Sequence, residues 1–157
     1  MVKVMKDKVV VITGSTSGIG LGIAKKFASE GASVVINGFG IESEIDQIIA
    51  ELTILGATDV MYNSADLSKP EEIDAMFTAI IDSFAKVDIL VNNAGIQFVS
   101  PIDEFPADKW ELIMRVCLNA SFYTIQNALP SMKNQQWGRI INLKKAVGSR
   151  ICYSDKL

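Results

Sequence analysis

Short apolar runs alternate along the chain with segments in which apolar residues recur at every third or fourth position. The apolar runs predict strands at residues 9–12, 33–37, 59–63, 87–92 and 138–142. The helical spacing predicts helices at residues 18–31, around 45–52, at 70–84 and at about 108–132. Because apolar strands that alternate with amphipathic helices form buried parallel sheets, the pattern predicts an α/β fold with a doubly wound parallel sheet.

The ends of two predicted helices carry local signals. Gly31 is a typical C-terminal cap for the first helix, because glycine adopts left-handed backbone angles without strain. Ser68 and Glu71, with Pro70 between them, have the spacing of a capping box at the start of the third helix. That helix carries an apolar stripe that we expect to face the core, formed by Ile73, Met76, Phe77, Ile80, Ile81 and Phe84.

Composition narrows the classes of function. With 157 residues, of which 49% are hydrophobic, the chain is long enough for one globular domain with a core. Its net charge of −3 argues against a surface for nucleic acid or anionic membranes. Residues 1–8 lead straight into the first strand and are too few to span a bilayer, so we expect no signal peptide.

The scarce residue types limit the chemistry further. The chain has no histidine, which excludes Ser–His and Cys–His catalysis and histidine-ligated metals, and we predict no metal site. The two cysteines, Cys117 and Cys152, form no disulfide framework, which fits a reducing cytoplasm. We therefore expect a cytoplasmic protein.

A glycine-rich turn links the first strand to the first helix. Gly14, Gly18 and Gly20 have the spacing Gly-x-x-x-Gly-x-Gly directly after the apolar run. Glycines let the backbone approach a pyrophosphate closely, and the N–H groups and dipole of the following helix attract the anion. On its own, the turn is also compatible with a tight connection that binds nothing.

Three motifs together resemble the short-chain dehydrogenase/reductase family. They are residues 13–20, 66–67 and 92–95, in the order and at the separations typical of that family. Residues 37–40, 95–97 and 118–122 resemble its bacterial D-3-hydroxybutyrate dehydrogenase subgroup. The resemblance covers about residues 6–143 and implies a Rossmann-like fold with NAD-dependent hydride transfer to or from a small 3-hydroxy acid.

The resemblance also implies which residues bind the cofactor. The glycine turn would hold the pyrophosphate, Asp66 and Leu67 would contact the adenine, and residues 93–95 would line the passage to the nicotinamide ribose. The expected cofactor-binding residues are Gly14, Ser15, Thr16, Ser17, Gly18, Ile19, Gly20, Phe39, Asp66, Leu67, Asn93, Ala94 and Gly95. Alternatively, Asp66 is a solvated acid at the start of a helix, and Asn93 is a hydrogen-bonding residue at the end of a strand.

The stretch after the second strand favours NAD over NADP. A 2′-phosphate is normally met by Arg or Lys, whereas residues 37–40 and Ser15 offer no cation. The acidic residue that usually binds the ribose hydroxyls is also absent, so the preference depends on the missing cation and on the resemblance. In the subgroup, an aromatic ring at the position of Phe39 packs near the adenosine; the alternative for Phe39 is a partly buried loop aromatic.

One residue is a candidate for substrate binding. The resemblance implies that the Gln97 amide hydrogen-bonds the substrate carboxylate, a task for which an amide donor is suited. The alternative is an exposed glutamine after a turn.

The catalytic residues of the family are not matched. The family uses a tyrosine as general acid/base with a lysine four residues later, a serine, and an asparagine on the long helix. The resemblance places Cys117 at the asparagine and Lys145 at the serine, and it places the tyrosine beyond residue 157. Tyr153 and Lys156 are three residues apart instead of four, so we expect no intact catalytic residue.

The family pattern ends after Asn142. We therefore predict a partial dinucleotide-binding domain at residues 1–143, incomplete at its C-terminal edge, followed by a divergent tail at 144–157. The pattern suggests a truncated or frame-disrupted relative. The last strand would then be an apolar edge, and we expect self-association there.

Three functions remain open from the sequence. The first is an NAD-dependent dehydrogenase of a small hydroxy acid, which the missing catalytic residues oppose. The second is a catalytically silent dinucleotide-binding module. The third is a non-functional remnant or an interaction partner of an intact homologue.

Overall fold

A computed structural model describes residues 4–143. Its five strands form one parallel sheet in the order β3-β2-β1-β4-β5, where β1 is Val9–Ile12, β2 is Ser33–Asn37, β3 is Asp59–Asn63, β4 is Ile89–Asn92 and β5 is Arg139–Asn142. The strand order reverses beside β1, which is the switch point where α/β sheets bind ligands. The predicted doubly wound parallel sheet is confirmed.

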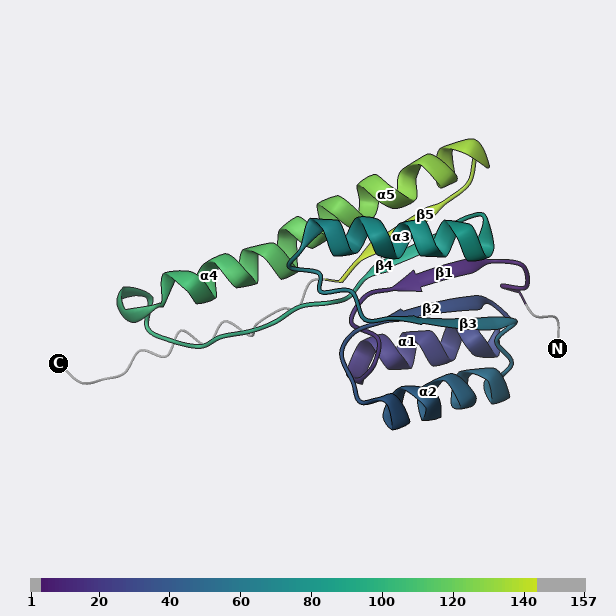
Figure 1. Cartoon of the computed structure of the whole chain (residues 1–157), viewed down its shortest axis with the longest axis horizontal. Helices are drawn as coiled ribbons and strands as arrows, with labels where there is room; N and C mark the ends of the chain where they lie inside the picture. The colour runs from purple at the N-terminus through teal and green to yellow at the C-terminus, as the bar shows by residue number, and fades with distance from the viewer. Residues whose placement is uncertain (1–3, 144–157) are drawn as a thin grey trace.

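Helices cover both faces of the sheet (Figure 1). On one face lie α1 (Gly18–Ser29) and α2 (Glu42–Leu55), and on the other lie α3 (Pro70–Phe84) and α5 (Ala120–Asn134). Alternate residues of β1 point into the two layers: Val9 and Val11 pack with α3 and α5, while Val10 and Ile12 pack with α1 and α2. All four are buried, as expected for a strand with helices on both sides.

The long predicted helix is present but not uniform. It runs as α4 (Ala107–Met114), a π-helical turn at Arg115–Asn119 and α5, preceded by a short 3₁₀ helix at Ile102–Glu104. A π turn inserts an extra residue into the hydrogen-bonding pattern and rotates the side chains that follow. Hydrophobic spacing alone did not reveal this change.

Two details of α3 differ from the sequence prediction. The N-cap is Lys69 instead of Ser68, and the carboxylate that reaches back is that of Glu72, which accepts a hydrogen bond from the Asp66 N–H at 2.7 Å. The predicted capping box is therefore wrong: Lys69 makes no side-chain capping hydrogen bond, and Glu72 accepts from Asp66 instead of from the N-cap residue. Within the expected apolar stripe, Ile81 is exposed, because it lies at the edge of the buried face.

The prediction for the end of α1 holds. Gly31 directly follows the C-cap residue Glu30 and has a left-handed φ of +88°.

Candidate functional site

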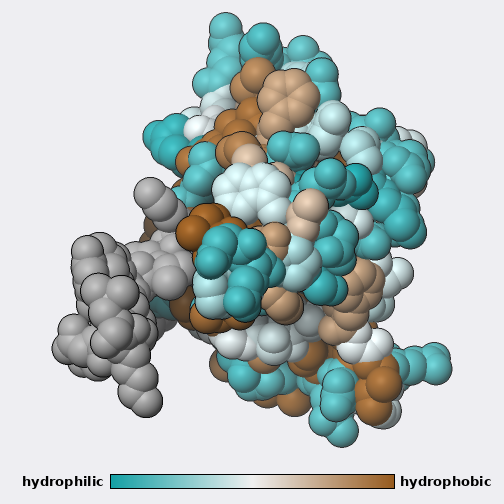
Figure 2. Space-filling model, turned by 90° about the vertical axis from the view of Figure 1, so that its left-hand side faces the viewer, coloured by the Kyte–Doolittle hydropathy of each residue, from teal (hydrophilic) through white to brown (hydrophobic). Residues whose placement is uncertain are grey.

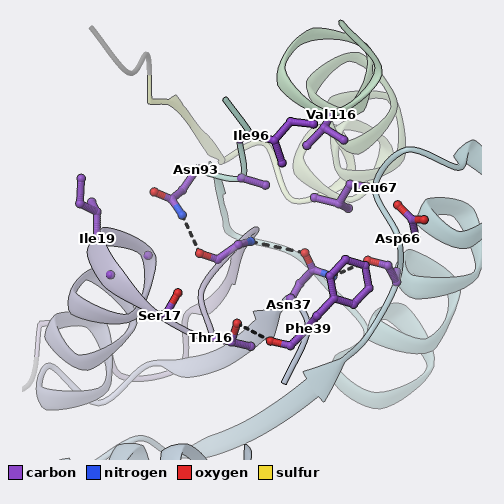
Figure 3. Close-up of a pocket in the computed structure, with 17 residues that line it drawn as sticks. Thr16, Ser17, Ile19, Asn37, Phe39, Asp66, Leu67, Asn93, Ile96 and Val116 are labelled. Carbon is purple, nitrogen blue, oxygen red and sulfur yellow. Dashed lines mark hydrogen bonds between the residues drawn. The ribbon is translucent and has the colours of Figure 1, made fainter. Parts of the chain in front are cut away.

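A pocket of about 550 Å³ opens at the carboxyl ends of the central strands. Figure 3 shows Ile19 and Asn93 at one end of it and Phe39 and Asp66 at the other. The described residues that line it are Gly14, Thr16, Ser17, Gly18, Ile19, Gly20, Asn37, Gly38, Phe39, Ala65, Asp66, Leu67, Asn93, Ala94, Gly95, Ile96 and Val116. The turn after β1 and the segment after β4 therefore meet in one cavity, as the sequence predicted.

The glycine turn is packed too tightly for side chains at two of its positions. A Cβ on Gly20 would overlap the Gly14 carbonyl oxygen and the Asn93 amide nitrogen, and would lie 2.9 Å from Ser15 Cα. At Gly14, where φ is +61°, a Cβ would lie 2.8 Å from Ala94 Cα. The backbone of the turn thus passes so close to the segment after β4 that a side chain at either position would collide with it.

The start of α1 presents its backbone to this cavity. Ser17 is the N-cap and makes no side-chain capping hydrogen bond. The first-turn N–H groups of a helix have no intrahelical partner, and the helix dipole places partial positive charge there. Because residues 17–20 line the pocket, this end of the cavity suits an anion such as a pyrophosphate.

Buried and partly buried hydrogen bonds connect the two motifs to each other. The Thr13 hydroxyl oxygen accepts from the N–H groups of Asn93 and Ala94, both at 3.0 Å. The Asn93 amide nitrogen in turn donates to the carbonyl oxygens of Thr13 (2.9 Å) and Gly14 (2.8 Å). Asn93 therefore has the strand-end structural role that the sequence left open, and it also lines the pocket.

The loop after β2 is held by hydroxyl groups. Thr16 Oγ1 donates to the Phe39 carbonyl oxygen at 3.0 Å (Figure 3), and the Tyr62 hydroxyl donates to the Gly38 carbonyl oxygen at 2.9 Å. The Asn37 side chain is buried below them, with its amide nitrogen donating to the carbonyl oxygens of Asn63 and Ala65. Phe39 is 71% exposed and borders the cavity.

The Asp66 end of the pocket carries a negative charge. The Ser68 N–H donates to Asp66 Oδ1 at 2.9 Å, and this bond, with help from the Ser68 hydroxyl and the Lys69 ammonium, lowers the pKa of Asp66 below its usual 3.8. Asp66 is therefore ionised at neutral pH and can only accept hydrogen bonds. Asp66 is partly exposed, lies just before α3 and lines the cavity. This position is compatible with both interpretations from the sequence, a cofactor contact and a solvated acid at the start of a helix.

Cys117 lies beside the pocket in the π turn. Its sulfur accepts from the Ile96 N–H and its thiol donates to the Ile96 carbonyl oxygen, each at 3.4 Å. The thiol thus ties the helix to the segment after β4. Lys145, like the rest of the predicted tail, lies outside the described residues.

Two predicted site residues do not line the cavity. Ser15 is fully buried beneath it, where its hydroxyl donates to the Ile12 carbonyl oxygen at 2.7 Å and accepts from the Asn37 N–H at 3.0 Å. Gln97 is exposed and follows the lining residue Ile96. Ser15 supports the turn from below, and the described structure leaves the substrate prediction for Gln97 untested.

The cavity includes residues that the sequence analysis did not select. Asn37, Gly38 and Ile96 lie within the stretches 37–40 and 95–97 that carry the resemblance, although they were not selected as binding residues, and Ala65 directly precedes the motif at 66–67. Val116 comes from the distant π turn, and no local sequence signal indicated it.

Residues 4–143 contain neither a metal-binding cluster nor a membrane-spanning helix. No group of three or more Cys, Asp or Glu side chains is placed to hold a metal ion in this part of the chain. Within the same residues, the helices are too short or too polar to cross a membrane.

Comparison with known proteins identifies the family. The sequence profile described as short chain dehydrogenase matches residues 8–153. The chain belongs to this family. It is 50% identical over 141 residues to D-beta-hydroxybutyrate dehydrogenase from Rhizobium meliloti, covering 90% of this chain and 55% of that protein. The enzyme of the same name from Cupriavidus necator is 46% identical over 145 residues, with 92% and 55% covered. The chain thus spans about half the length of these relatives.

Solved structures of short-chain oxidoreductases have the same fold. L-Sorbose reductase from Gluconobacter frateurii, in complex with NADPH and L-sorbose, superposes with a TM-score of 0.83 at 34% identity, covering 90% of this chain and 54% of that one. A metagenomic short-chain oxidoreductase in complex with NADP gives 0.82 at 30% identity, with 88% and 62% covered. The described strands and helices are therefore those of a short-chain oxidoreductase.

The cavity has the features that a dinucleotide requires. Gly14 and Gly20 allow the turn to pack closely against the segment after β4, and the uncapped start of α1 supplies N–H groups for a pyrophosphate. Leu67 and Val116 add apolar surface near the charged Asp66 end. The residues present thus fit the cofactor class of the family.

Proposed function

We propose that this chain binds NAD in the pocket at the carboxyl ends of β1, β2 and β4. The observation that carries the proposal is the joining of the glycine turn and residues 93–95 around one cavity. The pyrophosphate would lie against the start of α1. The adenine would lie between Phe39, Asp66 and Leu67, and the nicotinamide ribose would lie toward Asn93.

The choice of NAD over NADP is supported by the charges around the cavity. Among the described lining residues, Asp66 carries the one charged side chain, and it is an anion. A 2′-phosphate adds up to two negative charges, which no described lysine or arginine in the pocket would offset. The two solved structures with NADP(H) named above are 30% and 34% identical to this chain, so they do not determine its preference.

The reaction class implied by the relatives is oxidation of a small 3-hydroxy acid. Bound NAD would supply the hydride acceptor. Turnover also needs a group that takes the hydroxyl proton, and none of the described lining residues is a tyrosine or lysine. Asp66 is ionised but lies at the adenine end. We therefore propose that residues 4–143 bind the dinucleotide and do not by themselves complete the proton-transfer set, with Gln97 as the candidate for the substrate carboxylate.

Calorimetric titrations of the full chain with NAD and with NADP test the binding proposal. We expect saturable binding of NAD and at least tenfold weaker binding of NADP. A folded chain that binds neither would overturn the proposal and leave the interpretation as a remnant or an interaction partner.

A turnover assay with D-3-hydroxybutyrate and saturating NAD tests the second part. We expect no NADH formation above background at a chain concentration well above the measured Kd. Steady formation of NADH that scales with chain concentration would show that the proton-transfer set is complete.

A further inference from the structure

The turn after β2 carries no side chain at the position where dinucleotide-binding sheets often place an acid. Such an acid hydrogen-bonds the ribose 2′-hydroxyl and thereby selects NAD. Here Gly38 directly follows β2, with φ +149°. A Cβ built on Gly38 would lie 2.7 Å from Thr16 Oγ1 and 3.1 Å from Thr16 Cγ2. Thr16 therefore fills the space that a side chain at residue 38 would occupy.

The single proton of the Thr16 hydroxyl is already used. It donates to the Phe39 carbonyl oxygen at 3.0 Å, and a carbonyl oxygen can only accept. Within residues 4–143, no donor is found on Thr16 Oγ1. Thr16 lines the cavity, and its Oγ1 can therefore act as a hydrogen-bond acceptor for a ligand there.

The neighbouring side chains of Asn37 and Tyr62 are not placed to accept a hydrogen bond from a ligand in the cavity. The Asn37 amide is buried and donates to two backbone carbonyl oxygens, as described above. The Tyr62 hydroxyl donates to the Gly38 carbonyl oxygen from the β3 side and does not line the cavity. Tyr62 and Thr16 together fix two successive carbonyl groups, so the loop cannot easily rotate to present N–H donors.

We propose that Thr16 is a specificity-determining residue for the adenosine ribose. Its Oγ1 accepts a hydrogen bond from the ribose 2′-hydroxyl and offers only lone pairs to a 2′-phosphate, which itself has mainly acceptor oxygens. The assignment rests on the proposed function, since it requires the dinucleotide to occupy this pocket. It gives the chain a selection for NAD that does not depend on an acidic side chain.

A cycle that combines a protein change with a ligand change isolates this contact. Calorimetry measures the Kd values of ADP and 2′-deoxy-ADP for the wild-type chain and for Thr16→Val, which keeps the branched shape and removes the hydroxyl. The wild-type chain should prefer ADP by about threefold to tenfold, the usual effect of one hydrogen bond. We expect Thr16→Val to lose this preference and Thr16→Ser to keep it.

Two further variants separate the contact from general loop effects. Tyr62→Phe removes the other hydroxyl that holds the loop, so it should weaken both nucleotides equally and leave their ratio unchanged. Thr53→Val removes a hydroxyl that donates to a carbonyl oxygen within α2 at 2.8 Å, far from the cavity, and should change neither Kd.

A third ligand tests the selection against NADP. The wild-type chain should bind 2′,5′-ADP more weakly than ADP, and Thr16→Val should reduce this discrimination. An unchanged ADP to 2′-deoxy-ADP ratio in Thr16→Val would overturn the role of Thr16 while leaving the proposed function intact. If the wild-type chain binds neither NAD nor ADP, the proposed function and the role of Thr16 both fail.

Discussion

Strands β4 and β5 are neighbours in the same parallel sheet, yet their surroundings differ. All four residues of β4 are buried, and the segment after it forms part of the cavity. In β5 only Ile140 is partly covered, and Ile141 is 42% exposed. The pairing of the two strands is regular, from Ile89 with Arg139 to Asn92 with Asn142. The backbone of β5 is therefore regularly paired with β4, but its side chains are mostly exposed.

The difference separates a part of the described chain whose strands are covered from a part whose apolar side chains are exposed. Around the cavity, β1, β2 and β4 have helices on both sides, and the polar groups that connect them are paired. Toward β5 and the segment 96–102, apolar side chains reach the surface, including Ile96, Phe98, Val99 and Ile102. Figure 2, which views the end that is on the left in Figure 1, shows apolar residues interspersed with hydrophilic ones. We expect changes at the cavity to affect binding and changes at β5 to affect association.

The largest expected effect is that of Gly20→Ala. The new methyl group would overlap the Gly14 carbonyl oxygen and the Asn93 amide, and we expect NAD affinity to fall at least 100-fold, measured by calorimetry. Gly22→Ala is the matched control, because it lies in the same helix and a Cβ there meets nothing within 4 Å. The control should bind NAD normally and gain about 0.5–1 kcal/mol of stability. Normal binding by a folded Gly20→Ala chain would contradict the packing argument.

Thr13→Val should mainly lower stability. The change leaves the buried N–H of Asn93 and the partly buried N–H of Ala94 without their acceptor, and we expect the free energy of unfolding to fall by about 2–4 kcal/mol. Urea denaturation followed by circular dichroism measures it. Thr53→Val, at an exposed helical site, should change it by less than about 0.5 kcal/mol. Equal effects of the two variants would show that the link between the motifs adds little stability.

Ile141→Lys tests the exposed edge. A charged side chain on an edge strand opposes pairing with another strand, so we expect less self-association by sedimentation velocity and unchanged NAD affinity. Ile54→Lys is the control, since Ile54 is 85% exposed on α2 and distant from β5. If both variants associate as the wild-type chain does, or if the wild-type chain is monomeric, β5 is not a self-association site.

The smallest expected effect concerns the charges at the start of α3. The Lys69 side chain at 2.7 Å lowers the pKa of Glu72 below its usual 4.5, and the Asp66 N–H adds to this. A lowered folded-state pKa gives a stabilising contribution that is present above about pH 4.5 and is lost as the pH falls through the folded value. Glu72→Gln should therefore flatten the acid side of the stability–pH curve. A curve parallel to that of the wild-type chain would exclude this contribution.

The sequence was sufficient to predict the fold and most of the cavity, because strongly apolar strands and glycine spacing are local signals. The doubly wound parallel sheet and most residues on both sides of the pocket followed from them, whereas the strand order came only from the structure. Val116 was missed because it reaches the cavity through a π turn, which hydrophobic spacing does not encode. Ser15 was expected in the cavity but is buried, because the turn directs its hydroxyl toward the Ile12 carbonyl oxygen. Such orientations depend on backbone angles that motif spacing leaves undetermined.

The central claim is that the dinucleotide binds where the two motifs meet and not near β5. A ¹H–¹⁵N spectrum of the chain, recorded during titration with NAD, tests it residue by residue. We predict saturable shifts of the backbone amides of Gly14, Gly18 and Ala94, with little change at Ile140 and Ile141. Shifts confined to β5, or no shifts at saturating NAD in a well-dispersed spectrum, would contradict the claim.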